Sequence, residues 1–206
     1  MRATRRDSHD EQAREQNKDA NRHAAPILPK GGVSPHLAYP LHVPTRKIFI
    51  RFGQQSDAAR LPTEGVIAGP QPKRETWQQR VTKWLAEQQA GRRVVLVAED
   101  ETGLLGMVQL VFAFPPGYND PEAANGMDVA MMEGLRTRSG APPEVGNQLV
   151  AEVQKVAGKR NVRTLTFCLP MNANRALRQA KDWGFEEFRI MPEPDKMLAF
   201  FRKSID

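Results

Sequence analysis

The chain has 206 residues, of which 40% are hydrophobic and 26% charged, and its formal net charge is +6. This size suits one domain with an extension, and no apolar stretch approaches the roughly 20 residues that cross a bilayer. The single cysteine, Cys168, excludes an internal disulfide and a zinc site of the Cys/His kind. Acidic residues among the N-terminal arginines argue against a secretory signal or transit peptide. We therefore expect a cytoplasmic protein without a membrane segment or a metal centre.

The first 46 residues differ in composition from the rest. They are polar up to Ala25 and then rich in proline, so they cannot bury enough apolar surface to fold alone. We predict an N-terminal arm over residues 1–46, disordered or bound along a partner, and a folded domain over residues 47–206. The arm holds eight basic and five acidic residues, hence +3 of the net +6. Because the basic excess is spread over both parts, nucleic-acid binding is disfavoured.

Hydrophobic periodicity and turn residues predict seven strands and four helices within the domain. Trp77, Val81, Trp84 and Leu85 recur at the spacing of one buried helix face. The acidic turn 99–103 ends in Gly103, where a positive φ is expected, and joins two strands into a hairpin. In chain order the predicted elements are a strand over 47–51, a short helix capped by Ser56 or Asp57, a helix over 77–91, strands over 94–98, 104–114 and 127–135, a helix over 143–158, a strand over 164–169, a helix over 174–183, and strands over 185–191 and 197–202.

This order, with several local patterns, resembles the GNAT superfamily of acyl-CoA-dependent N-acyltransferases over about residues 47–203. Ile48–Arg51 is similar to the family's opening strand and Arg92–Phe114 to its central hairpin. Leu165–Leu169, an asparagine-rich turn, Ala176 and the closing Trp183–Phe185 resemble the strand, helix and Gly-Phe that follow. The resemblance implies an α/β (α+β) fold: a mixed, mostly antiparallel central sheet flanked by helices, with a flexible or extended N-terminal arm.

The resemblance also implies an acetyl-CoA site. In the family the cofactor enters where the fourth and fifth strands splay apart, and its pyrophosphate binds backbone N–H groups of an Arg/Gln-x-x-Gly-x-Gly/Ala loop that opens the next helix. Counting back from Leu149 places this loop at Ala141–Gly146. The positions that the resemblance assigns to acetyl-CoA are Thr137, Val145, Gly146, Asn147, Gln148, Phe167, Leu169, Asn172 and Asn174.

The predicted loop departs from the family pattern at every position except Gly146. Pro142 and Pro143 have no N–H to donate, and Glu144 brings a carboxylate to the place where a polyanion should approach. Two lost charge-assisted hydrogen bonds would weaken binding by ~100-fold or more. Arg136 and Arg138, just upstream, either compensate with side-chain cations or form a solvated rim, and we favour the rim. Acetyl-CoA binding is thus the part of the resemblance that the residues support least.

Proton transfer would also need substitutes for the family's usual groups. A tyrosine that protonates the leaving thiolate stands four residues before the closing glycine in many family members, and Ala180 occupies that position here. Tyr118, in the 115–126 loop, is the candidate replacement. All four histidines lie in the arm, so the base must be a carboxylate. Glu133 and Asp128 would lie on opposite faces of a regular strand, and we choose Glu133 because it is nearer the loop.

These observations leave two main functions open. The first is an N-acetyltransferase that transfers acetyl from acetyl-CoA to a small-molecule or protein amine. The second is a catalytically lapsed GNAT-fold module that docks into a larger assembly, for example a phage particle, through residues 1–46. Nucleic-acid binding through the arm ranks third, and a homo-oligomer is compatible with each function.

Overall fold

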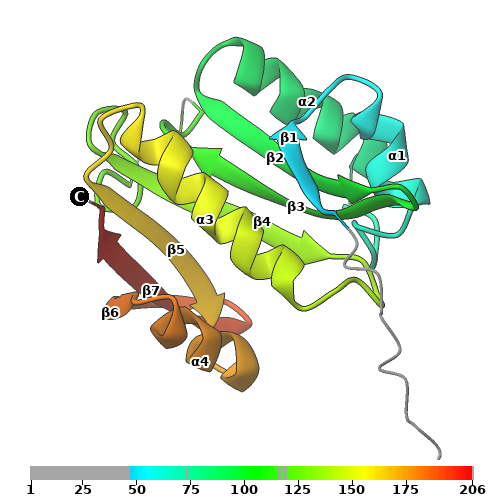
Figure 1. Ribbon diagram of the computed structural model, residues 1–206. Coiled ribbons are helices and arrows are strands. Elements are labelled where there is room, and N and C mark those ends of the chain that lie inside the picture. The colour runs from blue at the N-terminus through cyan, green and yellow to red at the C-terminus, as the bar shows by residue number, and fades with distance from the viewer. Residues whose placement is uncertain (1–46, 73, 116, 118–119, 206) are drawn as a thin grey trace, which may run out of the picture. The chain divides into compact units, whose positions relative to one another are not determined.

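The computed structural model describes residues 47–205 except residues 73, 116, 118 and 119 (Figure 1). The predicted arm, residues 1–46, lies outside the described residues, as does Tyr118. Within them the predicted order of seven strands and four helices is confirmed. The elements are β1 (Phe49–Phe52), α1 (Asp57–Thr63), α2 (Trp77–Gln89), β2 (Arg93–Asp100), β3 (Gly103–Val111), β4 (Val129–Thr137), α3 (Glu144–Gly158), β5 (Thr164–Pro170), α4 (Asn174–Asp182), β6 (Glu186–Glu193) and β7 (Lys196–Ser204).

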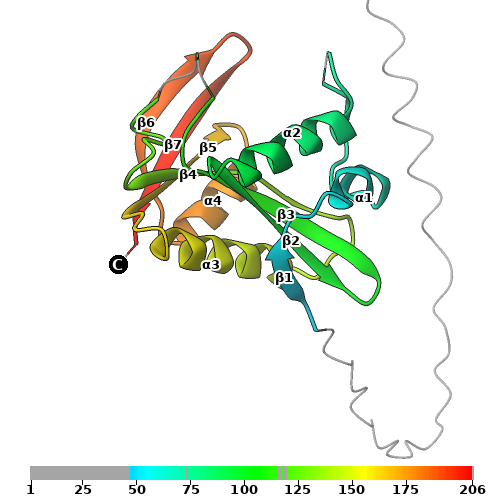
Figure 2. The ribbon, with the colours of Figure 1, turned by 90° about the horizontal axis from the view of Figure 1, so that it is seen from above.

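The strands form one sheet in the order β1-β2-β3-β4-β5-β7-β6. All neighbours are antiparallel except β4 and β5, which run parallel. The sheet separates α1 and α2 on one face from α3 and α4 on the other (Figure 2). The predicted mixed, mostly antiparallel sheet flanked by helices is therefore confirmed. None of the described helices is long and apolar enough to cross a membrane.

Apolar residues bury both faces of the central strands. Val94, Leu96 and Ala98 of β2 pack with α3, whereas Val95 and Val97 pack with α1 and α2. This alternation is the period of two that a strand imposes, and burial on both faces makes β2 continuously hydrophobic. The predicted buried face of α2 is also confirmed, because Val81 and Leu85 are buried and Trp77 and Trp84 are partly buried in the same cluster.

Most strand ends differ from the predictions by one to three residues, and at two of them a local contact gives the reason. β3 ends at Val111 rather than at residue 114, because the N–H groups of Phe112 and Ala113 both donate to the carbonyl of Arg92. β4 begins at Val129 rather than at residue 127. The side-chain oxygen of Asn125 accepts hydrogen bonds from the N–H groups of residues 127, 128 and 129 and holds this stretch in a turn.

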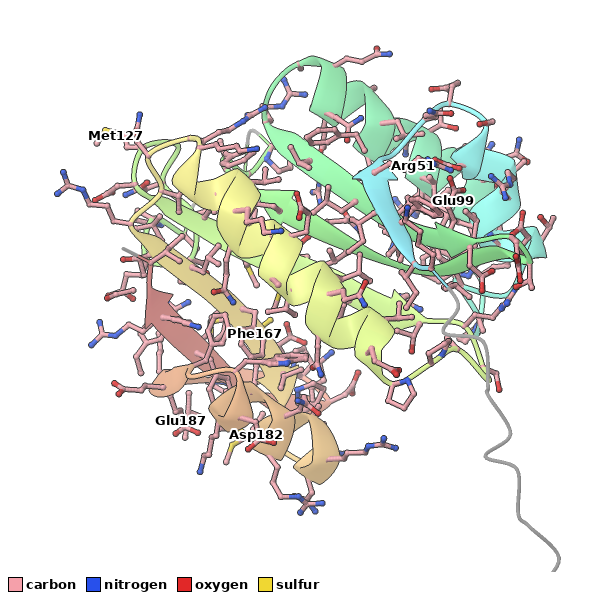
Figure 3. All side chains as sticks on the ribbon, viewed as in Figure 1. Arg51, Glu99, Met127, Phe167, Asp182 and Glu187 are labelled. Atoms are coloured by element: carbon pink, nitrogen blue, oxygen red, sulfur yellow. The ribbon has the colours of Figure 1, made fainter. Side chains whose placement is uncertain are left out.

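Arg51 of β1 connects two acidic residues from different elements. Its guanidinium donates to Glu99 of β2 at 2.8 and 2.9 Å and to Asp57 of α1 at 2.7 and 3.0 Å. Figure 3 shows Arg51 and Glu99 close together beside β1. Of the two predicted caps, Ser56 occupies the N-cap position of α1, but its hydroxyl makes no capping hydrogen bond within the described part of the chain. The Asp57 carboxylate accepts hydrogen bonds from Arg51 and from the N–H of Gln54.

Both carboxylates of this cluster titrate below their ordinary range. Burial raises the pKa of Asp57, but hydrogen bonds from Arg51 and from the Gln54 N–H outweigh it, and the net pKa is lowered. The hydrogen bonds from Arg51 lower the pKa of Glu99. The cluster therefore holds β1, β2 and α1 together most strongly when both carboxylates are ionised.

Candidate functional site

The parallel strands β4 and β5 separate soon after they meet. They pair only between Val129–Met131 and Thr164–Thr166. Beyond that point a cavity of about 810 Å³ opens between the two strands and α4. Its lining residues are Met131, Met132, Glu133, Gly134, Leu135, Arg136, Phe167, Cys168, Leu169, Ala173, Asn174, Arg175, Ala176, Gln179 and Trp183.

A bulge bends β4 at the cavity wall. β3 advances two residues, from Met107 to Gln109, while β4 covers three, from Arg136 back to Glu133. Gly134 sits in this bulge with φ of +59°, and a Cβ there would lie 2.9 Å from Nε2 of Gln109. The positive φ favours glycine, and any larger residue would also have to displace the Gln109 amide. The extra residue bends β4 just beyond the point where its pairing with β5 ends, and the bulged residues form part of the cavity wall.

Glu133 lies on this wall, immediately before the bulge, and its side chain is 34% exposed. It pairs with Gln109 across β3 and β4, so both side chains lie on the α2 face of the sheet. Arg93 Nη1 donates to Glu133 Oε2 at 3.0 Å. Asp128, the alternative base, precedes β4, where its carboxylate accepts from Asn125 Nδ2 at 2.9 Å. The assumption of a regular strand that includes both residues is therefore wrong, although Glu133 does line the cavity.

Cys168 contributes a thiol to the same cavity. Burial, together with the nearby carboxylates of Glu133 and Glu193, raises its pKa to about 11. A thiol with this pKa is almost wholly protonated at neutral pH, so it is a poor nucleophile. In the described part of the chain, no cluster of three or more His, Cys, Asp or Glu residues could hold a metal ion.

The predicted pyrophosphate loop lies beside the cavity at the start of α3. α3 begins at Glu144 after Pro143, and Val145 is buried in the core. A Cβ on Gly146 would meet nothing within 4 Å, so its backbone can be approached closely. The Asn147 side-chain oxygen accepts from Trp183 Nε1 at 2.9 Å, which links α3 to a cavity residue at the end of α4. The helix start is thus accessible, but its first turn carries the carboxylate of Glu144.

The structure separates the predicted site residues into two groups. Glu133, Phe167, Leu169 and Asn174 line the cavity. None of the described lining residues comes from α3, so Val145, Gly146, Asn147 and Gln148 lie outside it, and so do Thr137 and Asn172. Phe167, which is labelled in Figure 3, packs its ring against Phe185 and Phe201, with centroids 4.7 and 5.2 Å away, and lines the cavity.

Sequence reasoning missed several lining residues of α4. Arg175, Gln179 and Trp183 reach the cavity together with Ala176, whereas Ala180 faces the core and is fully buried. Their spacing of three or four residues on one helix face was a usable signal. Upstream, Arg136 lines the cavity and lies 5.2 Å from the Trp77 ring, and Arg138 donates to Thr102 at 3.2 Å. Arg138 is thus hydrogen-bonded outside the cavity, whereas Arg136 is one of its lining residues.

Comparison with known proteins identifies the fold. No known protein-family profile and no curated protein matches the sequence. Among solved structures, a ribosomal-protein-alanine N-acetyltransferase from Brucella melitensis shares 19% identity at a TM-score of 0.60, covering 76% of this chain and 99% of its own. The protein yncA of Salmonella typhimurium, solved with its cofactor acetyl-CoA, shares 16% identity at 0.60, with 78% and 95% covered.

A third similar structure is the spermidine/spermine N-acetyltransferase SpeG from Vibrio cholerae, with 11% identity, a TM-score of 0.58, and 76% and 92% of the two chains covered. A further structure, from Desulfovibrio desulfuricans, is assigned to the GNAT family of acetyltransferases, with 15% identity and a TM-score of 0.61. The chain therefore has the GNAT fold, as its sequence resemblance predicted.

Proposed function

We propose that this protein is an N-acyltransferase that transfers the acetyl group of acetyl-CoA to an amine. The observation that carries the proposal is the cavity between β4 and β5, at the place where the strands stop pairing. Beyond Met131 and Thr166 the strands no longer bond to each other. Their facing peptide groups can therefore bind the amides of a pantetheine chain. Cofactor-bound yncA has the same fold, which supports this placement.

Glu133 is the proposed base. It is the carboxylate of the cavity wall, and a general base must lie within hydrogen-bond reach of the acceptor's ammonium group, whose proton it removes before the nitrogen can attack the thioester carbon. The amine then attacks that carbon directly, the thioester C–S bond breaks, and CoA leaves as the thiolate. Tyr118, outside the described residues, remains the predicted donor of the proton that this thiolate takes up. Cys168 is protonated in the same cavity and forms no covalent intermediate in this scheme.

The proposed cofactor contacts follow from the two groups of predicted residues. Phe167, Leu169 and Asn174 would contact the pantetheine arm within the cavity, with Asn172 at its edge. Thr137 and the first turn of α3, including Val145, Gly146, Asn147 and Gln148, would contact the pyrophosphate. Open space beside Gly146 supports this arrangement, because a phosphate needs close approach to backbone N–H groups.

The start of α3 and the core position of Ala180 favour a second candidate function. Pro142 and Pro143 provide no N–H groups, Glu144 repels an anion, and a methyl group replaces the family's tyrosine hydroxyl. These features suit a GNAT-fold module that has lost catalysis. Such a module would act through a protein partner of residues 1–46.

Calorimetric titration of acetyl-CoA into the full chain separates the two candidates. Binding at micromolar to submillimolar concentrations supports the acyltransferase, and its absence at millimolar concentration favours the binding module. Because Cys168 is the chain's single thiol and lines the cavity, protection of Cys168 from iodoacetamide by acetyl-CoA would place the cofactor there. CoA release would then be measured with spermidine and with a peptide that begins with alanine. If the protein is instead a binding module, removing residues 1–44 should abolish its assembly with the protein partner.

A further inference from the structure

Arg93, at the start of β2, buries a charge beneath the cavity wall. Its side chain is 7% exposed and contacts three elements. Nε donates to Glu87 of α2 at 2.7 Å, and Nη1 donates both to Gln109 of β3 and, at 3.0 Å, to Glu133 of β4. Three acceptors from three elements thus converge on a single guanidinium. Among them, Glu133 is the one whose carboxylate reaches the cavity.

Anchoring α2 does not by itself account for this arrangement. The Glu87 ion pair alone would tie α2 to the sheet, and apolar residues pack a helix onto a sheet at lower desolvation cost than a buried charge. Of the two remaining contacts, one is to Glu133 of β4 and the other is to Gln109 of β3, which pairs with Glu133. The side-chain oxygen of Gln109 accepts the hydrogen bond from Arg93 Nη1. The other end of the Gln109 amide, Nε2, lies beside Gly134, where an added Cβ would be 2.9 Å from it. Gln109 therefore supports both the bulge and the guanidinium that holds Glu133.

We propose that Arg93 and Gln109 are positioning residues that hold the Glu133 carboxylate at the cavity wall. This inference rests on the proposed acyltransferase function, in which Glu133 is the base. A free glutamate side chain samples many rotamers, whereas a carboxylate fixed by a buried donor presents one oxygen to the donor and keeps the other for the amine. The guanidinium fork bonds Glu87 and Glu133 at once, which a lysine ammonium cannot do with the same geometry.

The test compares the same substitution in two arginine clusters. Arg93→Lys keeps the charge but loses the fork, and it should lower kcat by about 10- to 100-fold while KM for acetyl-CoA changes less than about threefold. Arg51→Lys is the matched control, because Arg51 also bridges two carboxylates but lies outside the cavity lining. Its kcat should stay within about twofold of the natural chain. Equal kcat values in both variants would overturn the proposal.

A second readout needs neither cofactor nor acceptor, so it separates failure of this inference from failure of the proposed function. Glu133 raises the pKa of Cys168, and the rate of Cys168 alkylation by iodoacetamide reports on the position of that charge. Glu133→Gln and Arg93→Lys should each change this rate by about twofold or more, and Arg51→Lys should leave it unchanged. An unchanged rate in Arg93→Lys overturns the proposal even if the chain proves inactive. Should Arg93→Lys fail to fold, Gln109→Leu replaces it, with the same expected result and the same contradicting one.

Discussion

The two ends of the proposed cofactor site differ in how well they suit acetyl-CoA. At the thioester end, a β-bulge, a buried arginine and a cavity wall from three elements bring Glu133 to the point where β4 and β5 separate. At the phosphate end, the first turn of α3 offers Gly146 but also Glu144, preceded by two prolines. The cavity depends on many packed residues, whereas a phosphate cradle depends on a few exposed backbone groups. Substitution can therefore degrade the second without disturbing the first.

Replacing Glu133 tests the thioester end and should have the largest effect. Glu133→Gln keeps an oxygen that accepts from Arg93 but removes the base, so we expect kcat to fall by ~100- to 1,000-fold with little change in acetyl-CoA affinity. Steady-state kinetics and calorimetry on the same preparation would measure both. A variant that keeps more than a tenth of the natural kcat would show that another group removes the proton.

Restoring the family pattern at the phosphate end should strengthen binding. Pro143→Gly with Glu144→Gly returns an N–H group and removes a carboxylate, and we expect acetyl-CoA affinity to rise by ~10- to 100-fold. Calorimetry would measure the change. Glu152→Gln is the control, because it removes a carboxylate from the same helix away from its start. If both variants gained equally, net charge rather than the helix start would limit binding.

Alkylation of Cys168 tests the environment of the thioester end without any ligand. With a pKa of about 11, the thiolate fraction and hence the alkylation rate should rise about tenfold per pH unit between pH 7 and 10. Mass spectrometry after timed iodoacetamide exposure would follow the modification. A rate that levels off near pH 8.5, as for a free cysteine, would mean that the thiol is not buried in the cavity.

The acid stability of the Arg51 cluster should show the smallest effect. Because this cluster lies outside the cavity lining, it also gives a reference for changes that affect folding alone. The pKa values of Asp57 and Glu99 lie below their unfolded values, so their stabilisation is complete above pH ~4 and is lost as the pH falls through the folded values. Asp57→Asn should cost about 2 kcal/mol at pH 7 and less at pH 3, where the natural chain has lost part of the same stabilisation. Urea unfolding at both pH values measures this difference. An equal cost at both values would mean that packing, not charge, is what Asp57 contributes.

Local patterns in the sequence predicted most of the fold. Helix and strand periods are set by neighbouring residues, so the order of the elements, the positive φ of Gly103 and the buried face of α2 could all be read directly. The end of β3 at Val111 and the start of β4 at Val129 could not be predicted in this way. They depend on bonds to the Arg92 carbonyl and the Asn125 side chain, which no periodicity reveals.

The site was predictable only in part. Glu133, Phe167 and Leu169 could be predicted to lie near this cavity because the family resemblance marks β4 and β5, and they do line it, while their roles stay predictions. Arg93 was missed because its acceptors Gln109 and Glu133 lie 16 and 40 residues away, and only pairing of β2, β3 and β4 brings them together. The bulge was missed because one glycine, Gly134, does not by itself distinguish a bulge from a regular strand.

The short pairing of β4 with β5 has a mechanical consequence for the whole sheet. Three residue pairs join β1–β4 to β5–β7, and a chain of pantetheine laid between the strands would add hydrogen bonds along the line where the sheet lacks them. A cofactor bound there acts as a missing strand. Amide hydrogen exchange in the second halves of β4 and β5 should therefore slow on acetyl-CoA binding more than exchange in residues 93–98 of β2, which pair with β3 without interruption.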